Sequence, residues 1–303
     1  MTEVLVPTDK FKSFNEFFYR ALKPNARPCS APEDPRVIVS PADCRTVVFN
    51  TIDSAQAIWV KGREFTVERL LGEAYPADAK RYHGGSLGIF RLAPQDYHRF
   101  HIPVDGVLDE PKLIEGEYYT VNPMAIRSAL DVYGENVRVI CPIDSAAHGR
   151  VMVICIGAMM VGSTVITRKK GDEVKRTDEL GYFKFGGSTL LLLFEPGQMR
   201  YDDDLVDNSN SALETLVRWR RLVLGRIAAD KCPGSRRHVN WPQPESASPR
   251  ARHAQAESHH GRETGCEAAH RGQSCAGRRA GAHARSGHVE RRPVACVGHV
   301  TMG

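Results

Sequence analysis

One short segment combines a nucleophile with two glycines. Gly186, Gly187 and Ser188 follow Phe185 and lead into the leucine-rich run 189–194. Glycine gives the backbone conformational freedom and leaves the carbonyl of Gly187 sterically open. A serine hydroxyl deprotonated by a nearby base could therefore attack the peptide carbonyl that precedes it. A glycine turn that happens to contain a serine is the competing interpretation, and this segment alone favours it.

Two histidines in H-x-x-H spacing form a second candidate. His98 and His101 could act as a base and an acid, or as metal ligands. Residues three apart face opposite sides of a strand but share one side of a helix, and Pro103 disfavours a long helix here. No third ligand with matching spacing follows, so the sequence favours no metal site. An ordinary pair of half-buried histidines is an equally good interpretation.

Asp43 is the third candidate. It follows the apolar run 37–39 after Ser40, Pro41 and one further residue. An aspartate in a turn usually caps the backbone, so alone it carries little information. An aspartate, a histidine and a serine together are nevertheless the parts of a nucleophile, base and orienting-group triad. The order of residues along the chain cannot establish whether the three lie close together.

We expect that most of the elements that position these residues are β-strands. Short β-branched or leucine runs, separated by Gly, Pro and Asp, occupy 36–40, 46–50, 137–141, 151–156, 163–167 and 189–194. A capping box of Ser13 and Glu16 predicts a helix that runs until Pro24, and a second helix is expected over 124–132. Because strands and helices do not alternate regularly, we expect an α+β body with a mainly antiparallel sheet and flanking helices.

The sequence predicts three regions: an N-terminal helix and arm over 1–30, a folded domain over 31–230 that contains the candidate residues, and a tail over 231–303. The tail holds twelve Lys and Arg against five Asp and Glu, and it contains no Leu, Ile, Phe or Tyr. Such a segment cannot bury enough apolar surface to offset chain entropy, so we expect it to be disordered. The formal net charge of +5 therefore comes from the tail and not from a basic folded surface, and no nucleic-acid partner is expected.

Several features predict an intracellular protein. Hydrophobic residues make up 42% of the chain, as in ordinary globular proteins, and the apolar run 190–194 is too short to cross a bilayer. Residues 1–12 contain no apolar stretch of the secretory type. The eight cysteines include no C-x-x-C pair, which favours reduced thiols and no metal. The aromatic residues of the 14–22 helix favour packing on the core, with contact to a membrane surface as the alternative.

Longer stretches of the chain resemble the phosphatidylserine decarboxylase family. The resemblance covers about residues 10–220, and the matching motifs follow in family order at 13–18, 22–28, 39–43, 97–106, 119–123, 157–163, 179–189, 204–209 and 214–218. Several long motifs in register are far more specific than any one of them. The G-G-S-T form is similar to the eukaryotic-type branch of the family.

The resemblance implies that the protein makes its own cofactor by self-cleavage between Gly187 and Ser188. Asp43 would orient His101, and His101 would deprotonate Ser188, whose oxygen attacks the carbonyl of Gly187. The products are a β chain, 1–187, and an α chain, 188–303, with Ser188 converted to an N-terminal pyruvoyl group. This ketone condenses with the substrate amine and accepts electrons as PLP does elsewhere, so neither PLP nor a metal is needed. His98 would return a proton to the substrate or position it.

The implied reaction converts phosphatidylserine to phosphatidylethanolamine and CO₂. The implied partners are the phospholipid substrate, the membrane surface at which a peripheral protein meets it, the two chains of one precursor, and a second copy in a homodimer. One departure from the family pattern is Cys44, which stands where a glycine commonly follows the aspartate, so its side chain could shift Asp43. Three alternatives stay open: a decarboxylase of a soluble aromatic amino acid, a Ser-His-Asp hydrolase, and an inactive lipid-binding relative.

Overall fold

The computed structural model describes residues 2–24, 26–62, 64–158, 163–218 and 223–226. The predicted tail, 231–303, lies outside the described residues, as do Met159 and Met160 in one of the family motifs.

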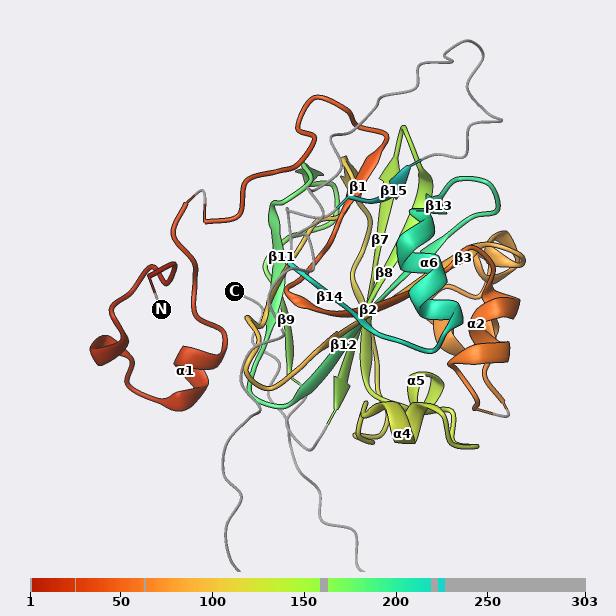
Figure 1. Ribbon diagram of the computed structural model, residues 1–303, viewed down its shortest axis with the longest axis horizontal. Coiled ribbons are helices and arrows are strands. Elements are labelled where there is room, and N and C mark those ends of the chain that lie inside the picture. The colour runs from red at the N-terminus through yellow and green to blue at the C-terminus, as the bar shows by residue number, and fades with distance from the viewer. Residues whose placement is uncertain (1, 25, 63, 159–162, 219–222, 227–303) are drawn as a thin grey trace, which may run out of the picture. The chain divides into compact units, whose positions relative to one another are not determined.

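Short helices and many strands make up this part of the chain (Figure 1). The α-helices are α1 (Phe14–Phe18), α2 (Ile52–Ile58), α3 (Val67–Leu71), α4 (Pro123–Ile126), α5 (Val132–Glu135) and α6 (Asp203–Asn210), and two 3₁₀ turns are η1 (Thr8–Lys10) and η2 (Ala79–Tyr82). The strands are β1 (Val37–Val39), β2 (Cys44–Phe49), β3 (Ser86–Leu92), β4 (Arg99–His101), β5 (Gly106–Leu108), β6 (Lys112–Ile114), β7 (Arg138–Ser145), β8 (Gly149–Ala158), β9 (Thr164–Ile166), β10 (Glu173–Val174), β11 (Glu179–Phe183), β12 (Gly187–Phe194), β13 (Arg200–Tyr201), β14 (Thr215–Val217) and β15 (Val223–Arg226).

A nine-stranded sheet forms the centre of the fold. Its order is β10-β5-β7-β8-β12-β3-β2-β14, with β6 also paired to β7, and each of these pairs is antiparallel. Two three-stranded antiparallel sheets, β1-β15-β13 and β4-β11-β9, complete the β structure. The predicted α+β class with a mainly antiparallel sheet is therefore confirmed.

Both faces of the central sheet are buried, and β12 shows why its sequence is a continuous apolar run. Leu190, Leu192 and Phe194 join one hydrophobic cluster, whereas Leu191 and Leu193 join the other. Successive side chains of a strand point to opposite faces, so a strand covered on both sides must be apolar throughout. Each leucine buried in this way contributes about 2 kcal/mol to the free energy of unfolding.

The small β4-β11-β9 sheet packs on the first of these clusters through Phe100, Leu180 and Phe183. Gly181 of β11 permits this close packing. A Cβ atom at Gly181 would lie only 2.1 Å from the carbonyl oxygen of Val165 in β9 and 2.9 Å from the Phe100 ring. The glycine of the E-L-G-Y-F motif is therefore required by the approach of neighbouring strands and not by a turn.

All six predicted strands are present, with shifted ends, but both predicted helices differ from expectation. The helix expected over 124–132 is wrong: α4 ends at Ile126, and Asp131 begins α5 by accepting a hydrogen bond from the Gly134 N–H. Helix α1 ends at Phe18, and Leu22 forms a bridge to Val4 instead of continuing the helix to Pro24.

The predicted capping box of α1 is half formed. The Ser13 hydroxyl accepts a hydrogen bond from the Glu16 N–H at 3.2 Å, as expected for an N-cap. The Glu16 carboxylate, however, accepts a hydrogen bond from the N–H of Lys12 at 2.8 Å. Local polar partners can thus set where a helix begins, but only the tertiary contacts of the next residues decide where it ends.

Candidate active site

Ser188 lies at the start of β12, inside the central sheet. Its backbone stands opposite Leu92 of β3 and Gly157 of β8, and Gly187 stands opposite Ala158. The Ser188 side chain is fully buried, and its Oγ has no hydrogen-bond partner among the described residues. Burying an unsatisfied hydroxyl costs about 1–3 kcal/mol. A buried hydroxyl without a partner, on the residue that directly follows a glycine, is the arrangement expected of a nucleophile held for a reaction with the glycyl carbonyl.

Asp43 lies at the same end of the sheet as Ser188. Arg45 of β2 stands opposite Arg91 of β3, and Ser188 stands opposite Leu92, the next residue of β3. Asp43 comes two residues before Arg45 and therefore lies at the same end of the sheet as Ser188. Because only β3 lies between β2 and β12, their backbones are separated by two strand spacings, roughly 10 Å.

The Asp43 carboxylate is bound by Arg27 of the N-terminal arm. The Arg27 guanidinium donates from Nη2 to one carboxylate oxygen at 2.8 Å and from Nε to the other at 3.5 Å. Arg27 is almost fully buried and also pairs with Glu3. The two contacts of the guanidinium fix the orientation of the Asp43 side chain. The orienting role of Asp43 toward His101 stays a prediction.

His101 is tied to the segment that carries Asp43 and to two polar groups. Its backbone N–H donates to the carbonyl of Pro41 at 2.8 Å. Its ring Nδ1 lies 3.1 Å from the carbonyl oxygen of Thr177, and Nε2 lies 3.2 Å from the Tyr97 hydroxyl. A carbonyl can only accept, so Nδ1 carries the proton in the neutral ring and Nε2 is left as the basic nitrogen. His101 therefore has the tautomer that a general base needs.

Thr177 holds its carbonyl toward His101 at the cost of backbone strain. Its φ is +81°, an uncommon conformation for a β-branched residue. Such strain costs on the order of 1–3 kcal/mol and clusters at functional sites. The sequence offered no signal for Thr177, whereas Arg27 and Tyr97 belong to motifs already singled out, K-P-N-A-R-P and Y-H-R-F-H.

The side chain of His98 is more completely buried from solvent than that of His101. Its ring is fully buried and stacks on Phe18 of α1, with centroids 3.6 Å apart. Nδ1 lies 2.9 Å from the carbonyl oxygen of Asp96, and Nε2 has no partner among the described side chains and backbone groups. Burial, aided by the charge of Arg20, lowers the pKa of His98 to about 4, against the hydrogen bond to Asp96. At neutral pH the ring is therefore an uncharged imidazole with one unpaired nitrogen.

The lowered pKa of His98 predicts acid sensitivity of the fold. The unfolded chain takes up a proton near pH 6.5 but the folded chain only near pH 4, so the free energy of unfolding falls as the pH drops through this interval. The full loss is on the order of 3 kcal/mol. We expect His98→Gln to abolish this loss, measured by urea unfolding at pH 7 and pH 4.5 in a Ser188→Ala background that keeps the chain uncut. Equal pH dependence in the presence and absence of His98 would contradict the assignment.

Cys44 is accommodated without disturbing the strand that it begins. Its side chain is fully buried in the same hydrophobic cluster as Leu92 and Val217, the residue paired with it on β14. Burial raises the pKa of the Cys44 thiol well above its ordinary value, with the charge of Asp43 adding to the effect. Cys44 therefore serves as a small apolar core residue rather than a reactive thiol.

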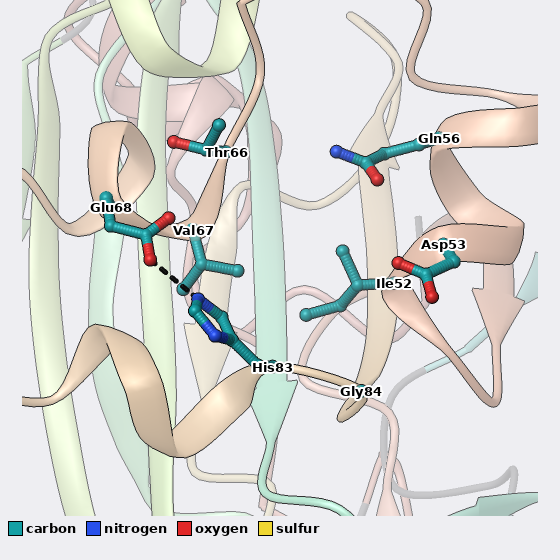
Figure 2. A pocket seen from close by; sticks show the side chains of 8 residues that line it. All are labelled: Ile52, Asp53, Gln56, Thr66, Val67, Glu68, His83 and Gly84. Carbon is teal, nitrogen blue, oxygen red and sulfur yellow. Dashed lines mark hydrogen bonds and ion pairs between the residues drawn. The ribbon is translucent and has the colours of Figure 1, made fainter.

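A surface depression lies at the opposite end of the sheet (Figure 2). It is lined by Ile52, Asp53, Gln56, Thr66, Val67, Glu68, His83 and Gly84, and the His83 Nε2 lies 2.6 Å from the Glu68 carboxylate. His83 and Gly84 precede Ser86, which pairs with Phe194 at the far end of β12 from Ser188. The depression thus belongs to a different region from the predicted site residues. Among the described residues, no group of three or more His, Cys, Asp and Glu is arranged to hold a metal ion.

Comparison with known proteins agrees with these motifs. Residues 14–218 match the family model described as phosphatidylserine decarboxylase. The chain is 58% identical over 231 residues to phosphatidylserine decarboxylase proenzyme 3 of Schizosaccharomyces pombe, and 53% identical over 210 residues to phosphatidylserine decarboxylase proenzyme 2 of Saccharomyces cerevisiae. These alignments cover 76% and 69% of this chain but only 24% and 18% of the yeast proteins, so the chain spans about a quarter or less of their length.

A bacterial relative matches over most of its own length. The phosphatidylserine decarboxylase proenzyme of Chlamydia muridarum is 44% identical over 228 residues, which are 75% of this chain and 74% of the relative. The family forms a pyruvoyl group from a serine, and the buried Ser188 hydroxyl without a partner fits that role. The chain belongs to the phosphatidylserine decarboxylase family.

Proposed function

We propose that this chain cleaves its own Gly187–Ser188 bond and then decarboxylates phosphatidylserine to phosphatidylethanolamine. The observation that carries the proposal is the Ser188 hydroxyl, buried without a partner beside the Gly187 carbonyl in a member of this family. The relatives named above are proenzymes of phosphatidylserine decarboxylase, which supports the same conclusion.

The cleavage uses residues of the chain itself. His101 takes the proton of Ser188 Oγ, the Oγ–carbonyl bond to Gly187 forms, and the Gly187–Ser188 C–N bond breaks as its nitrogen receives a proton. The amide has become an ester. Loss of the Ser188 Cα proton then expels the Gly187 carboxylate and leaves dehydroalanine, whose nitrogen departs as ammonia when water replaces it. Residue 188 ends as a ketone at the N-terminus of the α chain.

The ketone supplies an electron sink for the pair of electrons left on the substrate carbon when CO₂ departs. The buried surroundings of Ser188 exclude water from this carbon, and the sheet holds residue 188 at a fixed position. His98 then positions the substrate or returns a proton to it through its unpaired Nε2. A substrate carboxylate or phosphate beside the ring would raise the pKa of His98, so that Nε2 could take up a proton and pass it to the substrate.

Denaturing electrophoresis with intact mass measurement tests the proposal. We expect two chains that correspond to 1–187 and 188–303, with the second lacking a free terminal amine. The cleaved protein should release CO₂ from phosphatidylserine in vesicles and not from free aromatic amino acids. An intact chain that hydrolyses esters would favour a Ser-His-Asp hydrolase, and an intact chain without any turnover would favour an inactive lipid-binding relative.

The proposed binding partner is a membrane surface. Aromatic side chains of α1 and of the segment before the cleavage site would contact it. None of the helices in the described part of the chain is long and apolar enough to span a bilayer. Phe14 is 62% exposed and Phe185 is 45% exposed, and their rings pack edge to face with centroids 5.3 Å apart. Exposed Lys10 and Lys12 precede α1 and suit an anionic lipid surface. Contact with this surface would bring the lipid headgroup toward Ser188.

Phe14→Ser is expected to weaken binding to phosphatidylserine-containing vesicles about tenfold, because a phenyl ring inserted at the interface contributes roughly 1–2 kcal/mol. Vesicle flotation or sedimentation measures the change. Met124→Ser is the matched control, since Met124 is 83% exposed but lies on α4. Equal losses in the two variants, or none in either, would contradict this surface. The proposal also includes a homodimer. Analytical ultracentrifugation of the cleaved protein measures the mass of the assembly directly.

A further inference from the structure

Three successive backbone N–H groups fix the chain just before the cleavage site. The Phe183 N–H donates to the carbonyl of His98 at 2.9 Å, and the Lys184 N–H donates to the carbonyl of Ser163 at 3.1 Å. The third, that of Phe185, donates to the side-chain oxygen of Asn15 in α1 at 2.9 Å. The first two acceptors are backbone groups of neighbouring segments, whereas the last is a side chain 170 residues away.

Aromatic packing holds Asn15 in place against this segment. The Phe185 ring packs edge to face on Phe14 and on Phe18, with centroids 5.3 and 5.1 Å apart. Phe18 is buried and stacks on the ring of His98. Helix α1 therefore touches both the residue two positions before Gly187 and a histidine of the candidate active site. In Figure 1, the arm that carries α1 lies on the side of the sheet where β9 and β11 are drawn.

The anchor matters because two glycines follow it. Phe185 is held by Asn15, and from Gly187 onward the chain is held in the β12 ladder opposite Ala158. Only Gly186 remains between the two fixed points. Gly187 is the first residue of this ladder and pairs with β8, whereas the pairing of β12 with β3 begins at Ser188. Without the anchor, this end of the strand could fray and the Gly187 carbonyl could leave the position that the Ser188 hydroxyl must reach. A misplacement of about 1 Å is enough to cost large factors in the rate of such an intramolecular reaction.

We infer that Asn15 is a positioning residue for self-cleavage: its side-chain oxygen fixes the Phe185 N–H and thereby the scissile carbonyl of Gly187. The inference rests on the proposed self-cleavage and assigns one residue of α1 to it. Decarboxylation by the cleaved protein does not require the anchor, because residue 188 is then held by β12 alone. Asn15 is therefore expected to control how fast the enzyme matures but not how fast it turns over.

Pulse-chase translation of the full chain, followed by appearance of the 1–187 fragment, measures the cleavage rate. We expect Asn15→Ala to slow cleavage about tenfold, the effect of losing one hydrogen bond that orients the reacting groups. Asn15→Asp keeps an acceptor oxygen and should cleave within about twofold of the wild-type rate. Turnover per cleaved chain, measured after complete maturation, should be unchanged within about twofold in both variants.

Asn122→Ala is the matched control, because the Asn122 side chain accepts a backbone N–H, that of Met124, at the same distance of 2.9 Å but on α4. It should cleave at the wild-type rate. Wild-type cleavage by Asn15→Ala, equal slowing of Asn15→Ala and Asn15→Asp, or equal slowing of Asn15→Ala and Asn122→Ala would each overturn the role of the acceptor oxygen. A wild-type chain that never cleaves would instead refute the proposed function, and this inference with it.

Discussion

Replacing Ser188 by alanine is expected to leave a single uncut chain of 33.6 kDa without decarboxylase activity. The variant lacks the oxygen that attacks Gly187 and the atoms that become the ketone, so the loss of turnover should reach at least about 10⁴-fold. The fold should not suffer, because the Ser188 hydroxyl is buried without a partner and its removal leaves no polar group unsatisfied. Intact mass measurement, thermal unfolding and CO₂ release from phosphatidylserine vesicles check the three parts of this expectation.

Ser86→Ala provides the matched control. Ser86 is also a buried serine whose hydroxyl has no partner among the described residues, but it pairs with Phe194 at the other end of β12. This variant should cleave and turn over as the wild type does. If Ser188→Ala were still cleaved into two chains, the nucleophile would have to be another residue and the proposed mechanism would fail.

Substitution of the two histidines is expected to separate maturation from turnover. His101→Gln removes the base that takes the Ser188 proton and should slow self-cleavage by about 10²–10⁴-fold, the usual contribution of a general base. His98→Gln should cleave within about threefold of the wild-type rate, yet lose about 10²-fold or more in decarboxylation per cleaved chain. Fragment appearance after synthesis and CO₂ release per cleaved chain are the two measurements.

His83→Gln is the control for both variants, because His83 pairs with Glu68 in the depression at the far end of the sheet (Figure 2). It should change neither rate. The opposite pattern, in which His98 controlled cleavage and His101 controlled turnover, would exchange the roles assigned to the two residues. Equal losses in both measurements for both variants would indicate a purely structural contribution from the pair.

The sequence predicted the strand that carries Ser188 better than it predicted the helices. Residues 190–194 are apolar without alternation, as expected of a strand or helix buried on every side, and the shortness of the run between glycines and a proline favours a strand. The 124–132 segment has helical spacing but ends at Ile126, because Asp131 and Gly134 form a new N-terminus. Side-chain hydrogen bonds of this kind compete with a continuous helix and leave little trace in hydrophobic periodicity.

Pattern reasoning identified Asp43, His98, His101 and Ser188 as candidates, but it could not establish that they lie near one another. Strand order, with β3 between β2 and β12, places Asp43 and Ser188 at the same end of the central sheet, and the backbone N–H of His101 bonds to Pro41, close to Asp43 along the chain. The sequence pattern could not predict contacts in which a backbone group is one of the partners. The carbonyl of Thr177 beside His101 and the N–H of Phe185 on Asn15 depend on chain positions and not on residue types.

The position of β12 between β8 and β3 also determines what maturation leaves behind. A cut at 187/188 would divide the molecule into two polypeptides whose leucines and valines still share both cores, as Leu192 does with Val153. Separating them would mean dismantling the sheet, so the mature heterodimer should melt as one cooperative unit. Because the junction has become a ketone and a carboxylate, the original peptide bond cannot re-form. The native fold would then be reached efficiently only from the newborn precursor, and denaturation of the mature enzyme should be effectively a one-way event.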